Sequence, residues 1–194
     1  MKNNKLQSKD LINIGIFTAI YFVITAAVTM LSFIPVFYPL TAALVPLVGG
    51  VPFMLYLTKI KKFGMVLIMS LICGILMILT GMGYWALVTS AVFGILAELI
   101  IKSGNYASAK KSVLSYGAFS IWTVGNFFNF YIARDAYLAL VTEKFGPDYA
   151  SALTAYFPTW SLPVFAIAAF VFGIIGGLIG KSIMKKHFER GGIV

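Results

Sequence analysis

The sequence has little charge, one cysteine and one histidine, and each shortage excludes a class of protein. Only 11% of its 194 residues are charged, which is too few to cover the surface of a soluble domain of this size. As the single cysteine, Cys73 cannot form an intrachain disulfide. The sole histidine, His187, lies in a basic tail, where we expect it to be solvated.

Catalytic groups are equally scarce. Catalysis inside a membrane requires a positioned nucleophile with a base, or metal ligands, and the His, Cys, Asp and Glu residues do not have the spacing of metal ligands. Residues 175–182 look like a phosphate-binding loop, but Ile175 stands where its first glycine belongs and no strand precedes it. We therefore expect a chain that is not an enzyme, with no catalytic residues, no metal site and no cofactor.

Long apolar runs, in contrast, fill the chain, of which 60% is hydrophobic. About 20 mostly apolar residues cross the hydrocarbon core of a bilayer as a helix. Such runs cover residues 10–31, 40–58, 63–80, 84–101, 112–133 and 159–180. We expect an all-α integral membrane protein whose six transmembrane helices form one bundle and one domain, residues 1–194. The segment 134–158 is expected to be an amphipathic helix, a turn and a second short helical piece.

The positive charges fall on one side of these predicted spans. Thirteen of the fifteen Lys and Arg residues lie in the two tails and in the second and fourth connections. The other side holds only Arg134 and Lys144. Because cytoplasmic loops carry the excess of Lys and Arg, we expect a multi-pass protein of the cell membrane with both termini cytoplasmic. The same pattern indicates that the net charge of +9 orients the chain in the lipid bilayer. We therefore expect no nucleic acid as a partner.

Small residues interrupt the apolar runs in two ways. The second run contains two prolines and two glycines, and it therefore predicts a kinked or locally unwound helix: Pro46, Gly49, Gly50 and Pro52. Pairs of small residues four apart, which let helices approach closely in lipid, are Gly15 with Ala19, Gly173 with Gly177, and Gly176 with Gly180. We expect the last two pairs to pack internally. Gly15 and Ala19 predict a docking strip for another helix, from this chain or a partner.

Glu98 is the only carboxylate well inside a predicted span. It precedes Lys102 by four residues, the favourable order for a helical ion pair, and lies near the cytoplasmic end. A proton-coupled carrier usually places a carboxylate near the middle of the bilayer. We therefore expect a structural or interface role for Glu98.

Aromatic and amide side chains gather at the sparsely charged side. Asn126 and Asn129 are three residues apart, so they share one face of a helix. An amide in hydrocarbon is costly unless it is hydrogen-bonded; a neighbouring helix or a bound ligand would satisfy it. The surrounding Tyr and Trp residues are also typical of membrane interfaces. The candidate substrate-binding residues are Tyr84, Trp85, Asn126, Asn129, Arg134, Asp135 and Trp160. Together they predict an outward-facing pocket for a small, partly flat, polar molecule.

Motifs along nearly the whole chain carry a likeness to a known family. They are the opening segment 9–20, the Gly-Met-Gly-Tyr-Trp connection at 81–85, the Arg-Asp-Ala-Tyr segment at 134–137, the glycines of 176–180 and the basic tail. On these motifs the chain resembles the substrate-binding (S) component of energy-coupling factor (ECF) transporters, in the group labelled MptD or Trep_Strep.

The resemblance implies a six-helix protein that captures a vitamin or similar small-molecule micronutrient from outside, as a subunit of an ABC importer. Its implied partners are a transmembrane T component and two ABC ATPases. The first helix of S components meets the T component through an AxxxA-like motif, which maps to Gly15 and Ala19, with glycine in place of the first alanine. A stand-alone secondary carrier of a small organic solute is the alternative, followed by an intramembrane enzyme or an assembly factor.

Overall fold

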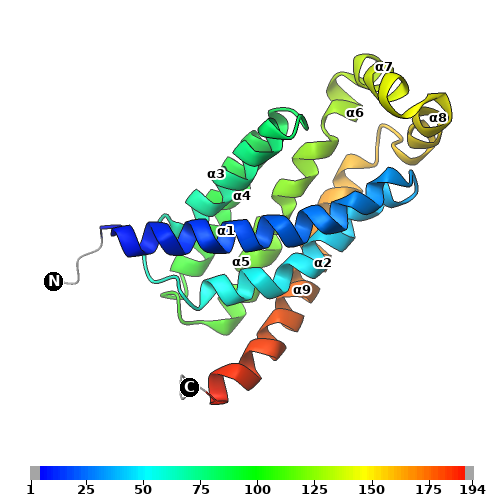
Figure 1. The fold of residues 1–194 in the computed structure, drawn as a ribbon. Coiled ribbons are helices and arrows are strands. Elements are labelled where there is room, and N and C mark those ends of the chain that lie inside the picture. Colours follow the sequence, from blue (N-terminus) through cyan, green and yellow to red (C-terminus); the bar gives the residue numbers. More distant parts are fainter. Residues whose placement is uncertain (1–4, 191–194) are drawn as a thin grey trace.

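The computed structural model describes residues 5–190 and the side chains of residues 5–185, and this part of the chain is helical, without strands (Figure 1). His187 therefore lies outside the described side chains. The helices are α1 (Ser8–Thr29), η1 (Met30–Phe33), α2 (Phe37–Leu57), α3 (Met65–Leu79), α4 (Trp85–Lys102), α5 (Ala109–Ser120), η2 (Ile121–Phe127), α6 (Asn129–Ile132), α7 (Arg134–Phe145), α8 (Pro147–Tyr156) and α9 (Leu162–Arg190). The two labelled η are 3₁₀ helices.

Four helical segments of the described chain are long and apolar enough to cross a membrane: Ser8–Phe33, Phe37–Leu57, Trp85–Lys102 and Leu162–Lys185. They match the first, second, fourth and sixth predicted spans. The third predicted span is the apolar but shorter helix α3, of 15 residues. The fifth is divided into α5, η2 and α6, so the sequence prediction of one continuous helix over 112–133 was wrong.

Contact with α4 explains the break in the fifth segment. The hydroxyl of Thr89 on α4 donates to the carbonyl oxygen of Trp122 at 2.7 Å, which competes with the α-helical bond that this carbonyl would accept. A Cβ atom at Gly125 would lie 2.7 Å from the Cα of Ala86, so the two backbones touch. The chain passes this contact as the tighter 3₁₀ helix η2.

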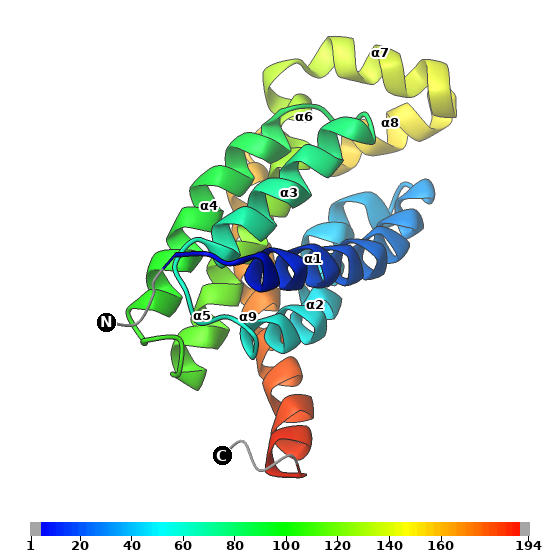
Figure 2. The same ribbon diagram turned by 60° about the vertical axis from the view of Figure 1, so that its left-hand side comes forward.

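The connections between the helices lie at two opposite ends of the molecule. Figure 1 and Figure 2 both show the start of α1, the α2–α3 and α4–α5 connections and the end of α9 toward one end, which we call the basic end. The α1–α2 turn, the α3–α4 turn and the α7–α8 pair lie toward the other, which we call the hairpin end. The lysines of the described tails and of the second and fourth connections belong to the basic end, whereas Arg134 and Lys144 belong to α7.

Glycines allow α2 and α9 to cross at close range. A Cβ atom at Gly176 would lie 2.6 Å from the carbonyl oxygen of Leu47, and one at Gly180 would lie 2.6 Å from that of Gly50. The expected internal packing of these glycines is therefore confirmed. The helix α2 continues through Pro46 and Pro52, so of the two predicted alternatives, a kinked or a locally unwound helix, the unwinding does not occur.

Glu98 is fully buried and caps α3 instead of pairing along its own helix. Its Oε2 accepts hydrogen bonds from the backbone N–H groups of Val66 and Leu67 at 2.8 and 3.2 Å, in the first turn of α3, where N–H groups lack helical partners. Its Oε1 accepts from the Tyr106 hydroxyl at 3.0 Å. Lys102 lies over the ring of Phe63. The expected structural role is confirmed, but the ion pair with Lys102 does not form.

Two short helices, α7 and α8, occupy the segment 134–158, as the sequence indicated. Gly146 joins them with φ +89°, a backbone conformation that glycine adopts without a steric penalty. The guanidinium of Arg134, at the start of α7, donates to the carbonyl oxygen of Phe157 at 2.7 Å and to that of Thr154 at 3.2 Å. These bonds tie the start of α7 to the end of α8, so the two helices form a closed hairpin.

Candidate binding cavity

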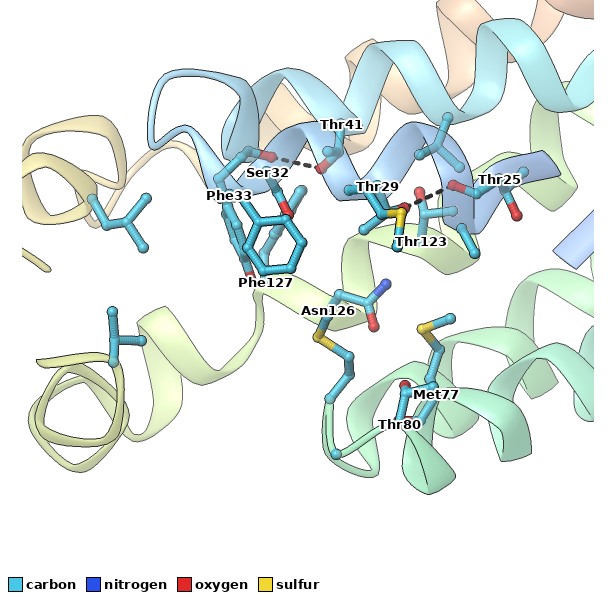
Figure 3. A pocket seen from close by; sticks show the side chains of 18 of the residues that line it. Thr25, Thr29, Ser32, Phe33, Thr41, Met77, Thr80, Thr123, Asn126 and Phe127 are labelled. Carbon is cyan, nitrogen blue, oxygen red and sulfur yellow. Dashed lines mark hydrogen bonds between the residues drawn. The ribbon is translucent and has the colours of Figure 1, made fainter. Parts of the chain in front are cut away.

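A cavity of about 400 Å³ lies beneath the α7–α8 hairpin, between α1, α2, η2 and the α3–α4 turn. This volume is typical of pockets that hold small organic molecules. Most of its lining is apolar: phenylalanines, methionines and tyrosines surround it, among them Phe22, Phe33, Phe127, Met30, Met77 and Met82. A smaller set of polar side chains projects from α1, α2 and η2 (Figure 3).

Threonines supply most of the polar groups. Thr25 and Thr29 on α1 donate their hydroxyl hydrogens to backbone carbonyls of their own helix, each at 2.9 Å. Thr41 on α2 and Thr123 on η2 do the same, at 2.6 and 2.9 Å. Because each hydrogen is already used, these hydroxyl oxygens can only accept from a molecule in the cavity.

Asn126 extends from η2 into the middle of the cavity. Figure 3 shows its amide between Thr29 on one wall and Met77 and Thr80 on the other. Its Oδ1 is buried and has no hydrogen-bond partner among the described residues. A buried polar atom without a partner costs about 1–3 kcal/mol, so Oδ1 favours an occupant that donates a hydrogen bond to it.

Aromatic contacts hold the hairpin over the cavity. The hydroxyls of Tyr38 on α2 and Tyr137 on α7 are 3.1 Å apart. Tyr149 on α8 donates its hydroxyl hydrogen to the carbonyl oxygen of Ser32, and the Phe33 ring lies 6.2 Å from that of Phe145. Burial raises the pKa of Tyr137 and of Tyr149, so both hydroxyls keep their hydrogen at neutral pH.

Asn126 is the one predicted binding residue among those that line the cavity. Asn129 does not line it, because η2 ends at Phe127 and Asn129 begins α6 after the turn at Phe128. A Cβ atom at Gly83 would lie 3.2 Å from Nδ2 of Asn129, which places this amide beside the α3–α4 turn. This amide is therefore not part of the cavity lining.

The other five predicted residues also lie away from the cavity lining. Tyr84 is 58% exposed and its ring contacts Trp85 at 4.8 Å, while Trp85 stacks on Phe128 at 5.5 Å. Trp160 is 69% exposed and Asp135 is exposed as well. Arg134 serves the hairpin closure described above. Their positions suit a membrane interface and helix termini.

The threonines and the methionines of the cavity were not among the binding residues predicted from the sequence. A signal was present: Thr25 and Thr29 are four residues apart within an apolar span, which places two hydroxyls on one helical face. The contributions of α2 and η2 could not be predicted in the same way, since Thr41 and Thr123 approach them only through the helix packing.

The strip of small residues on α1 faces outward. Gly15 and Ala19 are both exposed, and a Cβ atom at Gly15 would meet nothing within 4 Å. The side chains around them are apolar and exposed as well, with Leu11, Ile12 and Ile16 each more than half exposed. No helix of the described chain therefore covers this strip.

Within residues 5–185, no group of three or more His, Cys, Asp or Glu side chains could hold a metal ion. Neither the curated proteins nor the solved structures contain a significant match to the chain. One family does match: a profile described as "Hypothetical bacterial integral membrane protein (Trep_Strep)" covers residues 8–190. The chain belongs to this family, and it is an integral membrane protein.

Proposed function

We propose that this member of the Trep_Strep family is the substrate-binding S subunit of an ECF-type ABC importer, which captures a vitamin-like or heterocyclic micronutrient from outside. The observation that carries the proposal is the cavity of about 400 Å³ with the buried, unpartnered Oδ1 of Asn126 in its middle. Apart from Lys144, the described cavity wall consists of apolar side chains and neutral hydrogen-bonding groups, which suits binding rather than catalysis.

The proposed orientation follows from the two ends of the molecule. The cytoplasmic side of a membrane protein carries the excess of Lys and Arg, and the basic end holds the lysines of the described tails and two connections. In a six-span arrangement with α3 and the α5–η2–α6 segment as the two further spans, both termini are cytoplasmic. The hairpin end then faces outward, and the cavity beneath it receives its substrate from outside the cell membrane.

The proposed partners are a transmembrane T component and two ABC ATPases, and ATP hydrolysis belongs to the ATPases. The exposed strip on α1 supports this assignment, since Gly15 and Ala19 leave room for a second helix to approach closely. Apolar side chains border the strip on both sides. A helix of the T component lying along it would cover the smooth face.

Affinity purification of the chain from its native membranes tests the assignment. We expect a second integral membrane protein and ATP-binding-cassette ATPases to co-purify, and we expect Gly15→Leu and Ala19→Leu to lose them. Ala139→Leu is the matched control, because Ala139 is an exposed small residue on α7 at the hairpin end. Unchanged complex recovery from both α1 variants would contradict the docking role of the strip.

Uptake measurements separate this function from a stand-alone carrier. Liposomes that contain the purified chain alone should not accumulate solute, whereas liposomes with the full complex should do so only with ATP inside. Accumulation by the chain alone without ATP would favour the carrier. Against it, the charged residue among the described cavity lining is Lys144, with no carboxylate to couple uptake to protons.

A further inference from the structure

Some hydrogen-bonding groups of the cavity can only accept a hydrogen bond, and this restricts the chemistry of the molecule that can occupy it. Five threonines line the cavity, and each spends its hydroxyl hydrogen on a backbone carbonyl: Thr25, Thr29, Thr41, Thr80 and Thr123. Each oxygen is left as an acceptor. The unpartnered Oδ1 of Asn126 is a further acceptor, and it lies in the middle of the cavity.

Donors lie elsewhere on the wall. Among the described lining residues, the amide Nδ2 of Asn126 and the hydroxyl of Ser32 donate to no protein group. Tyr38 and Tyr137 use only one of their two hydroxyl hydrogens on each other, and Tyr149 donates its hydrogen to the carbonyl oxygen of Ser32. The threonines therefore form an acceptor wall, and the donors come from Asn126, Ser32 and the tyrosine pair.

Charge is restricted too. Among the described lining residues, Lys144 alone carries a charge, and it is exposed at the edge of the cavity. A carboxylate or phosphate held against the threonines would face their oxygens without a donor, and a cation there would face no carboxylate. Burying an unpaired charge costs far more than burying a neutral group. An occupant of the interior is therefore neutral.

From these groups we infer the substrate class: a small, flat, neutral molecule with N–H or O–H donors along the edge that faces the threonines and an acceptor for Asn126 or Ser32. The donors bond to the threonine oxygens and to Oδ1 of Asn126, and the aromatic and methionine side chains cover the flat faces. The inference rests on the proposed function as a binding protein, and it adds which chemistry the cavity accepts and which it rejects.

Three probes built on one ring system test the class on the full chain in lipid nanodiscs, with empty nanodiscs subtracted. Naphthalene-2,3-diol carries two O–H donors, 2,3-dimethoxynaphthalene keeps both oxygens without the donors, and 2-naphthoate is an anion. We expect saturable binding of the diol, at least about tenfold tighter than that of either other probe. Equal or tighter binding of the dimethoxy compound or of the naphthoate would overturn the class, as would an absence of saturable diol binding.

Two variants connect this preference to the threonines. Thr29→Val removes one acceptor at nearly constant shape, so diol binding should weaken about two- to tenfold while dimethoxynaphthalene binding stays unchanged. Thr58→Val is the control: the Thr58 hydroxyl makes the same kind of backbone bond, to Leu55, but at the basic end. If Thr29→Val bound the diol as tightly as the unmodified chain does, the threonine oxygens would not be the acceptors of the ligand's donors.

The substrate class and the importer assignment can fail independently of each other. Selective diol binding by a chain that recruits no T component and no ATPases would leave the substrate class standing and remove the importer assignment. A chain that assembles with those partners and binds naphthoate best would leave the importer standing and remove the substrate class.

Discussion

Gly50 of α2 and Gly176 of α9 lie backbone to backbone, so that a Cβ atom added at either glycine would overlap main-chain atoms of the other helix. This crossing fixes α9 against α2, the helix that carries Thr41 and Tyr38 to the cavity. Since a backbone cannot move aside as a flexible side chain can, the crossing tolerates no larger residue.

Gly176→Ala should therefore destabilise the protein. The added Cβ would lie 2.5 Å from the carbonyl oxygen of Pro46, and overpacking of this kind costs about 1–3 kcal/mol. We expect the unfolding temperature in detergent to fall by about 3 °C or more. Gly15→Ala is the matched control, because its Cβ would meet nothing within 4 Å. Equal unfolding temperatures for the two variants would contradict the close crossing.

Glu98→Ala should destabilise the basic end. The substitution leaves the N–H groups of Val66 and Leu67 without the carboxylate that they bond to, and each lost partner in a buried place costs about 1–3 kcal/mol. Glu98→Gln keeps an acceptor oxygen, so it should lose less. Thermal unfolding measures both, with Glu143→Ala on the exposed surface of α7 as the control. If Glu98→Ala unfolds at the same temperature as Glu143→Ala, the cap contributes nothing.

The helices could be predicted from the sequence because apolar runs and four-residue glycine spacing are local properties. The runs gave the positions of α1, α2, α4 and α9, and the glycines indicated the crossing of α9 with α2. The division of the fifth run could not be predicted. It depends on the hydroxyl of Thr89, 33 residues earlier in the chain, which bonds to Trp122.

The candidate site was harder to predict than the fold for a related reason. Aromatic and charged residues near the ends of spans look alike whether they line a cavity, as Tyr137 does, or face outward, as Trp160 does. Asn126 was identified because an amide inside an apolar run is costly anywhere. The turn at Phe128, where η2 ends and α6 begins, could not be predicted in this way, and only Asn126 of the two asparagines lines the cavity.

Asn126→Leu should therefore reduce ligand binding, whereas Asn129→Leu should leave it unchanged. Leucine cannot supply the hydrogen bonds of an amide, and losing the partner of a buried polar ligand group costs about 1–3 kcal/mol, or about tenfold in affinity. Mass spectrometry of small molecules extracted from the purified proteins gives the amount retained by each variant. Equal retention by the two asparagine variants would move the binding site away from the cavity.

Tyr149→Phe should loosen the α7–α8 hairpin without unfolding the chain. The Tyr149 hydroxyl bonds to the carbonyl oxygen of Ser32 in η1, which joins the hairpin to the end of α1 on the far side of the cavity. Loss of one such bond, worth about 0.5–1.5 kcal/mol net, should raise the opening equilibrium of the hairpin about two- to tenfold. Hydrogen exchange of the amides in residues 134–156 measures that equilibrium. Tyr156→Phe is the control, since Tyr156 is an exposed tyrosine of the same helix. Faster exchange in Tyr149→Phe alone would make the hairpin a cover that opens over the cavity, whereas identical exchange in both variants would mean that the bond to Ser32 does not hold it closed.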